Sequence, residues 1–200
     1  MNHDYEVFLN FWFLDFTQNL NTQAIMQRWF AMNPDFDQEL QTQFGDLLQQ
    51  AEQEKLAHWQ ETPRSLLALI ILLDQLSRNL YRGSAKAFAN DAQALSLAKQ
   101  MREKNWVQQL HPLERLFVYL PFEHSESLDD QVFCLQAFEQ LQTQVPATDQ
   151  KLFGLFTEYA DKHYQVIKRF GRFPHRNARL NRLSSPEEIA FLEEPGSHFG

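Results

Sequence analysis

Residues 62–83 read TPRSLLALIILLDQLSRNLYRG, and this stretch turns from the most apolar part of the chain into one of its most polar. Thr62 can cap a helix, and Pro63 suits the first helical position, where no backbone N–H is needed. Residues 66–73 are all apolar, which predicts a helix that is buried on every side. A run of eight apolar residues is far shorter than the roughly 20 that span a bilayer, so we expect a core helix and no membrane contact.

Asp74 and Arg78 follow this apolar run and lie four residues apart, on one face of the predicted helix. Two interpretations of the pair stay open. As a solvated ion pair at the helix end it would contribute about 0.3–0.5 kcal/mol. In the wall of a pocket, loss of one partner would cost about 3–5 kcal/mol. Gly83 then offers a left-handed residue at which the helix can stop.

Composition limits the class of protein. The chain has 200 residues, enough for one domain over residues 1–200, and its 18 phenylalanines predict a bulky aromatic core. The net charge of −8 argues against a general nucleic-acid binder. A single cysteine, Cys134, excludes an internal disulfide and indicates a reducing compartment. The opening residues lack the features of a signal peptide, so we expect a cytoplasmic protein.

Apolar residues recur at helical spacing along the chain, and no segment alternates like a strand. The pattern predicts an all-helical fold whose helices pack on their neighbours. Residues 4–13 form the first expected helix. The later helices are expected to begin at Asn21 or Thr22, Asn33, Thr62, Asn90 or Asp91, His111, Ser127, Thr148 and Ser185. Gly171 is the expected C-terminal stop of the long helix that starts at Thr148.

The segment from His163 to Arg182 has the most unusual composition. It carries six basic residues and no acid, so the remainder of the chain has a net charge of −14. One interpretation is a basic strap that ties the tail across an acidic body. The other is an anion site, because guanidinium groups bind carboxylates and phosphates with two hydrogen bonds. The two interpretations are compatible, and the second singles out Arg172, Arg176 and Asn177.

Histidines and carboxylates supply further candidates. His124, Glu126 and His175 are candidates for acid–base catalysis, since an unperturbed histidine pKa lies near 6.5. A metal site would draw on Asp74, Glu123, His124, Glu126 and either His163 or His175. None of these has the HExxH spacing, so we expect no metal. The chain also lacks GxSxG, GxGxxG and P-loop motifs, which argues against a serine-hydrolase elbow and a dinucleotide fold.

Three segments together resemble one known family. They read LALIILLDQLSRNLYRGSAKAFANDAQAL, ERLFVYLPFEHSESLDDQ and IKRFGRFPHRNARLNRLSSPEEIAFL. They are similar to the bacterial family catalogued as domain of unknown function 924, and the resemblance covers nearly the whole chain. It implies an all-α array of about eight to nine helices, similar to tetratricopeptide-type superhelices, and it implies no activity. Asn181 departs from the family pattern, which usually has glycine there, although asparagine tolerates a left-handed backbone better than most residues.

The polar residues that the family pattern retains lead us to expect that these three segments converge on one polar cleft. The first hypothesis is a binding module for an anionic small molecule or a peptide group. Its ligand-binding residues would be Asp74, Arg78, Arg82, Arg172, Arg176 and Asn177, with His124 and Glu126 also shaping the pocket. The second is a hydrolase or transferase in which His124 or His175 is the general acid–base. The third is a structural network whose function is contact with a protein partner.

Overall fold

The protein, described over residues 4–197 in a computed structural model, is helical with no strand in that range. Its α-helices are α1 (Asp4–Phe13), α2 (Thr22–Trp29), α3 (Pro34–Glu52), α4 (Pro63–Ile71), α5 (Ser77–Leu80), α6 (Asp91–Glu103), α7 (Pro112–Glu123), α8 (Leu128–Gln144), α9 (Gln150–Phe170) and α10 (Pro186–Leu192). The shorter turns are η1 (Ala57–Glu61), η2 (Leu72–Leu76), η3 (Ala85–Phe88), η4 (Val107–Gln109) and η5 (Pro174–Arg176). Since η2 joins α4 to α5 without a break, the described residues form nine separate α-helical rods. The expected all-helical fold is confirmed.

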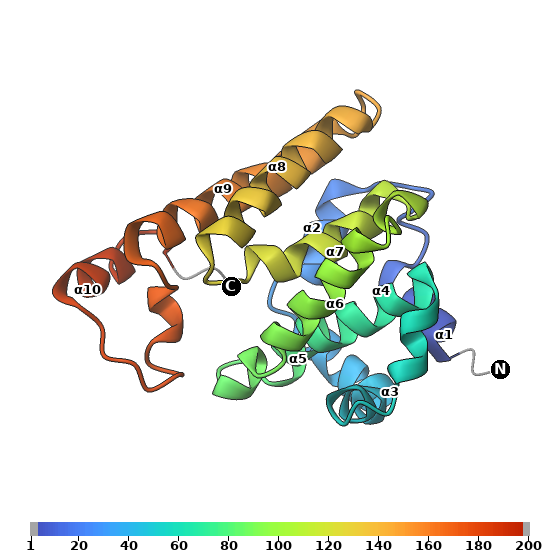
Figure 1. The fold of residues 1–200 in the computed structure, drawn as a ribbon, viewed down its shortest axis with the longest axis horizontal. Coiled ribbons are helices and arrows are strands. Elements are labelled where there is room, and N and C mark those ends of the chain that lie inside the picture. The colour runs from blue at the N-terminus through green and yellow to red at the C-terminus, as the bar shows by residue number, and fades with distance from the viewer. Residues whose placement is uncertain (1–3, 198–200) are drawn as a thin grey trace.

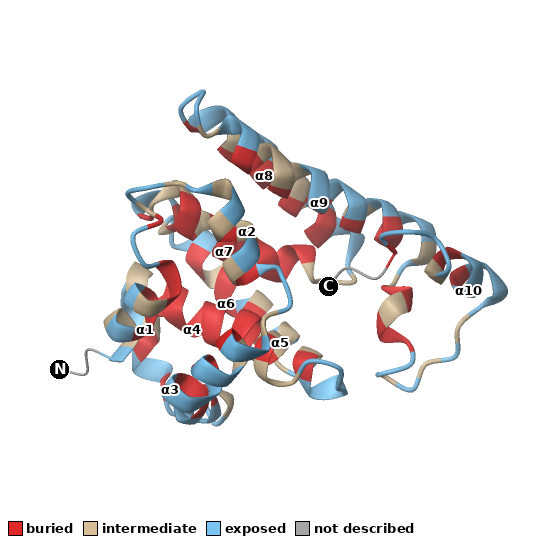
Figure 2. Ribbon diagram, turned by 180° about the vertical axis from the view of Figure 1, so that it is seen from behind, coloured by how far each residue is buried: buried red, intermediate tan, exposed pale blue. Residues whose placement is uncertain are grey.

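The central rod runs through α4, η2 and α5. The Thr62 side chain caps it by accepting a hydrogen bond from the backbone N–H of Ser65, as predicted. Every residue from Ser65 to Leu76 is buried, which confirms a core helix and is visible as a red stretch along α4 (Figure 2). The turn η2 is π-helical, with one residue more per turn than an α-helix. Such turns are often found at functional sites.

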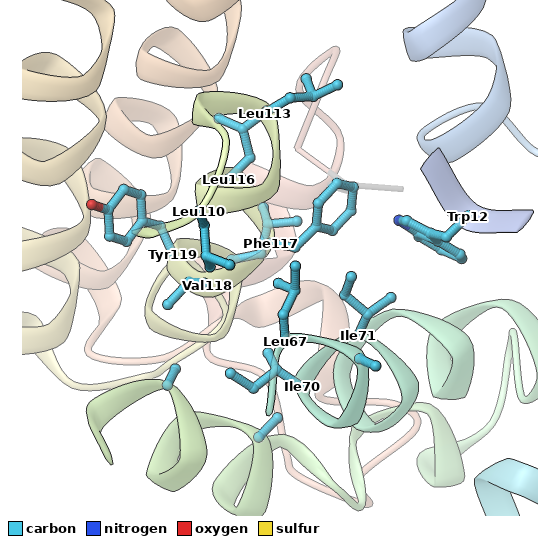
Figure 3. Packing of buried hydrophobic residues seen from close by; sticks show 14 of the residues in the cluster. Trp12, Leu67, Ile70, Ile71, Leu110, Leu113, Leu116, Phe117, Val118 and Tyr119 are labelled. Atoms are coloured by element: carbon cyan, nitrogen blue, oxygen red, sulfur yellow. The ribbon is translucent and has the colours of Figure 1, made fainter. Parts of the chain in front are cut away.

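The core around this rod is aromatic, as the composition predicted. The Trp29 and Phe117 rings meet edge to face at 4.8 Å between centroids, and Trp12 stands edge to face on Phe117 at 5.6 Å. Leu67 and Ile71 of α4 lie beneath Phe117 (Figure 3). Edge-to-face pairs contribute about 0.5–1.5 kcal/mol each beyond the burial of their area, so these pairs tie α1, α2 and α7 to one another.

Helix α7 opens with a capping box at His111, but it runs through Pro121 to Glu123. The sequence predicts that Pro121 ends or kinks this helix and that residues 121–127 form a loop that carries Glu123. A proline removes only its own N–H bond, and the helix continues a few residues beyond it. This extension places Glu123 on a rigid helix, one residue before His124. Helix α9 begins at Gln150 with Asp149 as its N-cap residue, rather than at Thr148.

Helices α8 and α9 form a long antiparallel pair that leans on the body made by α1 to α7 (Figure 1). Gly171 ends α9 with a left-handed backbone at φ 68°, as predicted. The chain next forms η5 and then α10. The basic segment lies beside α5 and η3 (Figure 1). A small second core of Val166, Ile167, Phe173 and Phe191 anchors this tail. The pairing of neighbouring helices fits a tetratricopeptide-like arrangement, which stays a prediction.

Candidate functional site

The three segments singled out in the sequence do meet. The end of the central rod, the end of α7 and the turn η5 are joined by hydrogen bonds between residues up to 85 positions apart. We call the buried set of titratable side chains at this junction the polar centre. It consists of Asp74 in η2, Arg78 in α5, Asp91 at the start of α6, Glu123 and His124 at the end of α7, His163 in α9 and Arg176 in η5.

Asp74 lies at the base of the polar centre, and its side chain is 1% exposed. Its Oδ1 lies 2.7 Å from His124 Nδ1 and 3.2 Å from Arg78 Nη1, while its Oδ2 accepts a 2.6 Å bond from Gln75 Nε2. Burial by itself would raise the pKa of Asp74. The interaction with His124, followed by the charge of Arg78, outweighs burial and holds that pKa well below its usual range. Asp74 is therefore ionised at neutral pH.

His124 sits at the C-terminal end of α7, where it is the first residue after the helix. Burial, followed by the charge of Arg78, lowers the pKa of His124, so its ring is neutral at pH 7. Because Asp74 is ionised, His124 Nδ1 carries the proton of the neutral ring and donates a hydrogen bond to the carboxylate. Nε2 is left as the basic nitrogen. A carboxylate that fixes the tautomer and orientation of a histidine is the arrangement found in general bases.

Asp91 bridges two arginines. Arg78 donates two bonds to it, at 2.9 and 3.1 Å, and Arg176 Nη1 lies 3.2 Å from its Oδ2. The Arg176 guanidinium lies over two rings, 4.8 Å from the centroid of Phe88 and 4.5 Å from that of Phe173. This contact ties η5 in the tail to η3 and α6 in the body.

Arg176 is the least compensated charge of the polar centre. It is 6% exposed, and its Nε has no hydrogen-bond partner among residues 4–197. Burial, followed by repulsion from Arg78, lowers the pKa of Arg176 to about 10. A buried guanidinium that lacks full compensation is destabilised relative to one with a complete set of partners.

Glu123 and His163 form a neutral pair. Burial, followed by repulsion from Asp74, raises the pKa of Glu123 to about 8. Burial lowers the pKa of His163 to about 3, although its Nδ1 lies 2.8 Å from the Tyr159 carbonyl oxygen. His163 Nδ1 also lies 3.3 Å from Glu123 Oε1. At pH 7 this contact joins a protonated acid and a neutral ring, so it is not an ion pair.

Arg172 and Asn177 of the basic segment lie outside the polar centre and bond to a second set of polar residues. We call the whole second set the tail clamp, and it comprises Glu126, Arg172, Asn177, Arg182 and Glu188. Arg172 forms two bonds to Glu188, at 2.6 and 2.7 Å, and Arg182 forms two to Glu126, at 2.7 and 2.9 Å. Asn177 lies between them, accepting from Arg182 Nε and donating to Glu188.

The tail clamp holds the loop after α9 in shape. Glu126 Oε1 accepts the backbone N–H of Phe173 at 2.8 Å, which fixes the ring that stacks on Arg176. The hydrogen bond from Arg172 is the main cause that lowers the pKa of Glu188 to about 2. Asn181 has φ 53°, the left-handed backbone for which the family pattern usually has glycine. The tail clamp thus positions Arg176 indirectly, through Phe173.

The structure divides the sequence candidates into three groups. Asp74, Arg78, His124 and Arg176 meet in the polar centre, whereas Glu126, Arg172 and Asn177 belong to the tail clamp. His175 is half-buried beside Phe173, 5.5 Å between ring centroids, and its charge contributes to the low pKa of His163. Arg82 lies apart from both groups.

Arg82 sits on the surface with Asp37, which lies 3.3 Å from its Nε. Both line a separate pocket of about 360 Å³ together with Met32, Pro34 and Leu80. The carboxylate of Asp37 also accepts a 2.7 Å bond from Asn79. Arg82 is therefore a surface residue with its own partner and does not contribute to the polar centre.

Sequence reasoning did not place Asp91, Phe88 or Phe173 at the site. Asp91 looked like a helix start, and it is the first residue of α6, so its local role concealed its long-range one. The one available signal was that Asp91 and His163 belong to the family pattern of polar residues.

No group of three or more His, Cys, Asp or Glu side chains within residues 4–197 is arranged to hold a metal ion.

The model of the family described as "Bacterial protein of unknown function (DUF924)" matches residues 8–196. A solved structure of a protein of unknown function from Agrobacterium tumefaciens is 34% identical in sequence and superposes with a TM-score of 0.74. The match covers 88% of this chain and 94% of that one. No curated protein matches the chain. None of the helices between residues 4 and 197 has the length and apolar character needed to cross a membrane. The chain belongs to the DUF924 family.

Proposed function

We propose that this member of the DUF924 family binds the anionic group of a small molecule or of a peptide in its polar centre. Arg78 and Arg176 would hold the anion. The observation that carries the proposal is the state of Arg176, a buried guanidinium with an unpartnered Nε and only a share of one carboxylate. An incoming anion would complete its set of partners.

Asp91 occupies the position that such an anion would take. It accepts bonds from both arginines, so it acts as an internal substitute for a ligand carboxylate or phosphate. Its side chain is 19% exposed and that of Arg78 is 20% exposed, which makes this the outer edge of the polar centre. A ligand would reach the arginines from this edge and compete with Asp91. The proposal assigns Arg172 and Asn177, both held in the tail clamp, a supporting role.

The test combines calorimetry and thermal denaturation with inorganic phosphate, acetate, nucleotides and sugar phosphates. An anion at 100 times its dissociation constant should add about 2.7 kcal/mol of stability. Asp91→Asn removes the internal competitor and should raise anion affinity about tenfold or more, because hydrogen bonds to charged groups contribute about 1.5–3 kcal/mol. Arg176→Lys should lower the affinity, because lysine cannot reproduce a planar guanidinium fork.

Arg179→Gln is the matched control, since Arg179 is an exposed arginine of the same segment. It should leave anion affinity unchanged. A flat response of the wild-type protein and of Asp91→Asn to every anion would contradict the proposal. The polar centre would then be a structural network, and the protein-partner hypothesis would be the one to pursue.

A second candidate function is acid–base catalysis by His124, in a hydrolase or transferase. The contact of 2.7 Å between Asp74 and His124 favours it, because this contact orients a ring that is neutral at pH 7. His124 Nε2 would accept a proton from the nucleophile or substrate, and the imidazolium would be stabilised by Asp74. His175 lies beside Phe173, and the contact of His124 with Asp74 makes His124 the candidate for this role.

Hydrolysis of p-nitrophenyl acetate and p-nitrophenyl phosphate provides the first assay. The rate should fall at acidic pH as His124 gains a proton, and His124→Ala should remove this limb of the pH–rate profile. Asp74→Asn should lower the rate while the protein still folds. If turnover survives His124→Ala with an unchanged profile, the general base is a different residue.

A further inference from the structure

We propose that the protein has a second binding site, between α6, α7 and α8, for a small organic carboxylate with an apolar or aromatic body. The pocket there has a volume of about 240 Å³. Its lining residues are Arg102, Asn105, Val107, Gln108, Tyr119, Phe133, Gln136, Ala137 and Gln140. None of them belongs to the polar centre or the tail clamp, so this proposal stands independently of the proposed function.

The pocket is apolar at its base and polar at its rim. Val107, Tyr119 and Ala137 are buried and Phe133 is half-buried, which makes an aromatic and aliphatic base. The other five lining residues are exposed, and they are one arginine and four amides. Pockets that bind small molecules commonly combine an apolar lining with a few polar groups that orient the ligand.

The charge of the pocket selects for anions. The chain has 26 acidic residues, yet none of them lines this pocket. The Arg102 guanidinium forms no ion pair and no side-chain hydrogen bond within residues 4–197, in contrast to Arg172 and Arg182, which are each paired with a carboxylate. Arg115 adds a second positive charge nearby, because it donates to the backbone carbonyl of Gln108.

Aromatic rings hold Arg102 in place without neutralising it. Its guanidinium carbon lies 4.6 Å from the centroid of Phe133 and 5.8 Å from that of Phe122. Such cation–π contacts fix the plane of the guanidinium but leave its N–H groups available. A carboxylate can therefore approach the edge of Arg102 and form two hydrogen bonds.

The remaining lining residues indicate what the carboxylate carries. The hydroxyl of Tyr119 points away from the core side chains around Phe117, as Figure 3 shows. It can therefore contribute a polar group to the pocket. The volume is below the roughly 300–1,000 Å³ of pockets for drug-sized ligands, so the ligand is of about amino-acid size. Its body would pack on the Tyr119 and Phe133 rings, and the rim amides would bind hydroxyl, amide or amino groups.

Benzoate is the probe, because it joins a carboxylate to an aromatic ring. Isothermal titration calorimetry on the full chain should show saturable binding with a dissociation constant of about 1 mM or tighter. Arg102→Gln should weaken it about tenfold or more, because a charged hydrogen-bonded pair is lost. Phe133→Leu should weaken it through loss of ring contact, with far-ultraviolet circular dichroism showing that the fold persists. Arg179→Gln, at an exposed arginine outside the pocket, should bind benzoate like the wild type.

Two further ligands separate charge from shape. Benzamide has the same ring without the charge and should bind at least tenfold more weakly, whereas inorganic phosphate has charge without the ring and should not compete. The proposal is overturned if benzoate gives no saturable binding or if Arg102→Gln binds it unchanged. It is also overturned if only Arg176→Lys loses it, since benzoate would then occupy the polar centre. Equal competition by phosphate would reduce the site to an unselective anion contact and would overturn the assignment of a carboxylate ligand.

Discussion

The base of the polar centre and the Arg182–Glu126 pair of the tail clamp contain the same kinds of residue in different environments. In the polar centre, the side chain of Asp74 is 1% exposed and that of Arg176 is 7% exposed. In the tail clamp, Arg182 and Glu126 are 24% and 29% exposed although their two hydrogen bonds are as short as any in the centre. Short distances therefore do not distinguish the two sets, whereas desolvation does.

Desolvation explains why only the polar centre has strongly shifted protonation in both directions. Asp74 stays ionised at pH 7, and its negative charge adds to burial in raising the pKa of Glu123. Glu123 therefore stays protonated at pH 7. Separated acid and base roles of this kind are typical of functional sites, and buried structural networks can also produce them. In the tail clamp, water screens the pair of Arg182 and Glu126, so this pair contributes little energy and mainly fixes geometry. The following predictions test this contrast.

The largest effect is expected for Asp74→Ala. The change leaves Arg78 and His124 buried without their common carboxylate, which should cost about 3–5 kcal/mol of the free energy of unfolding. Urea denaturation at pH 7 measures it. Asp161→Ala, which removes an exposed acid of α9, is the control and should change stability by about 0.5 kcal/mol or less. A loss below about 1 kcal/mol for Asp74→Ala would show that the polar centre contributes no more to the free energy of unfolding than the surface pairs do.

The second prediction concerns pH and Glu123. Folded Glu123 keeps its proton up to a pKa of about 8, whereas the unfolded residue loses it above about 4.5, so the stability that it contributes falls as pH rises between these values. His163 opposes this below pH 6.5, because its folded pKa is about 3 and the unfolded ring binds a proton there. His111 and His124 also have lowered pKa values and oppose Glu123 in the same way, and this opposition fades above pH 6.5 as the rings of the unfolded chain lose their protons.

The contribution of Glu123 is therefore the difference in stability between the wild-type protein and Glu123→Gln, measured from pH 6.5 to 8. This difference should fall by up to about 2 kcal/mol across the range, since one proton contributes about 1.4 kcal/mol per pH unit. Urea denaturation of both proteins across this range measures the difference, because glutamine does not titrate. A difference that stays constant with pH would assign the titration to another group.

The smallest effect is expected for Glu126→Gln in the tail clamp. Global stability should fall by about 1 kcal/mol or less, because the ion pair with Arg182 is partly exposed. Amide hydrogen exchange at Phe173 should accelerate more clearly, since Glu126 accepts that N–H. Salt should weaken the wild-type clamp in the same direction. Arg82→Gln, at a surface pair outside both regions, is the matched control and should leave the exchange rate at Phe173 unchanged. A loss as large as that of Asp74→Ala would contradict the contrast between the two regions.

Local chemistry explains which features could be predicted. The caps at Asn21, Asn33, Thr62 and Ser185 were predicted correctly, because a capping side chain bonds to a backbone group only two or three residues away. Asp74 and Arg78 do meet, as their spacing indicated. Arg78 nevertheless donates two hydrogen bonds to Asp91, which lies 13 positions along the chain and beyond a turn whose path no local pattern specifies.

The sequence by itself determined that the chain is helical, where most helices begin, and which family it belongs to, because periodicity, caps and motifs act over a few residues. Only the tertiary structure decided which of the many charged residues are buried together. The contact between Arg176 and Asp91 joins positions 85 apart, and the shifted pKa values of Glu123 and His163 arise from desolvation by several helices at once. Burial is a property of the assembled fold, so the division between polar centre and tail clamp could not be predicted from residue type or spacing.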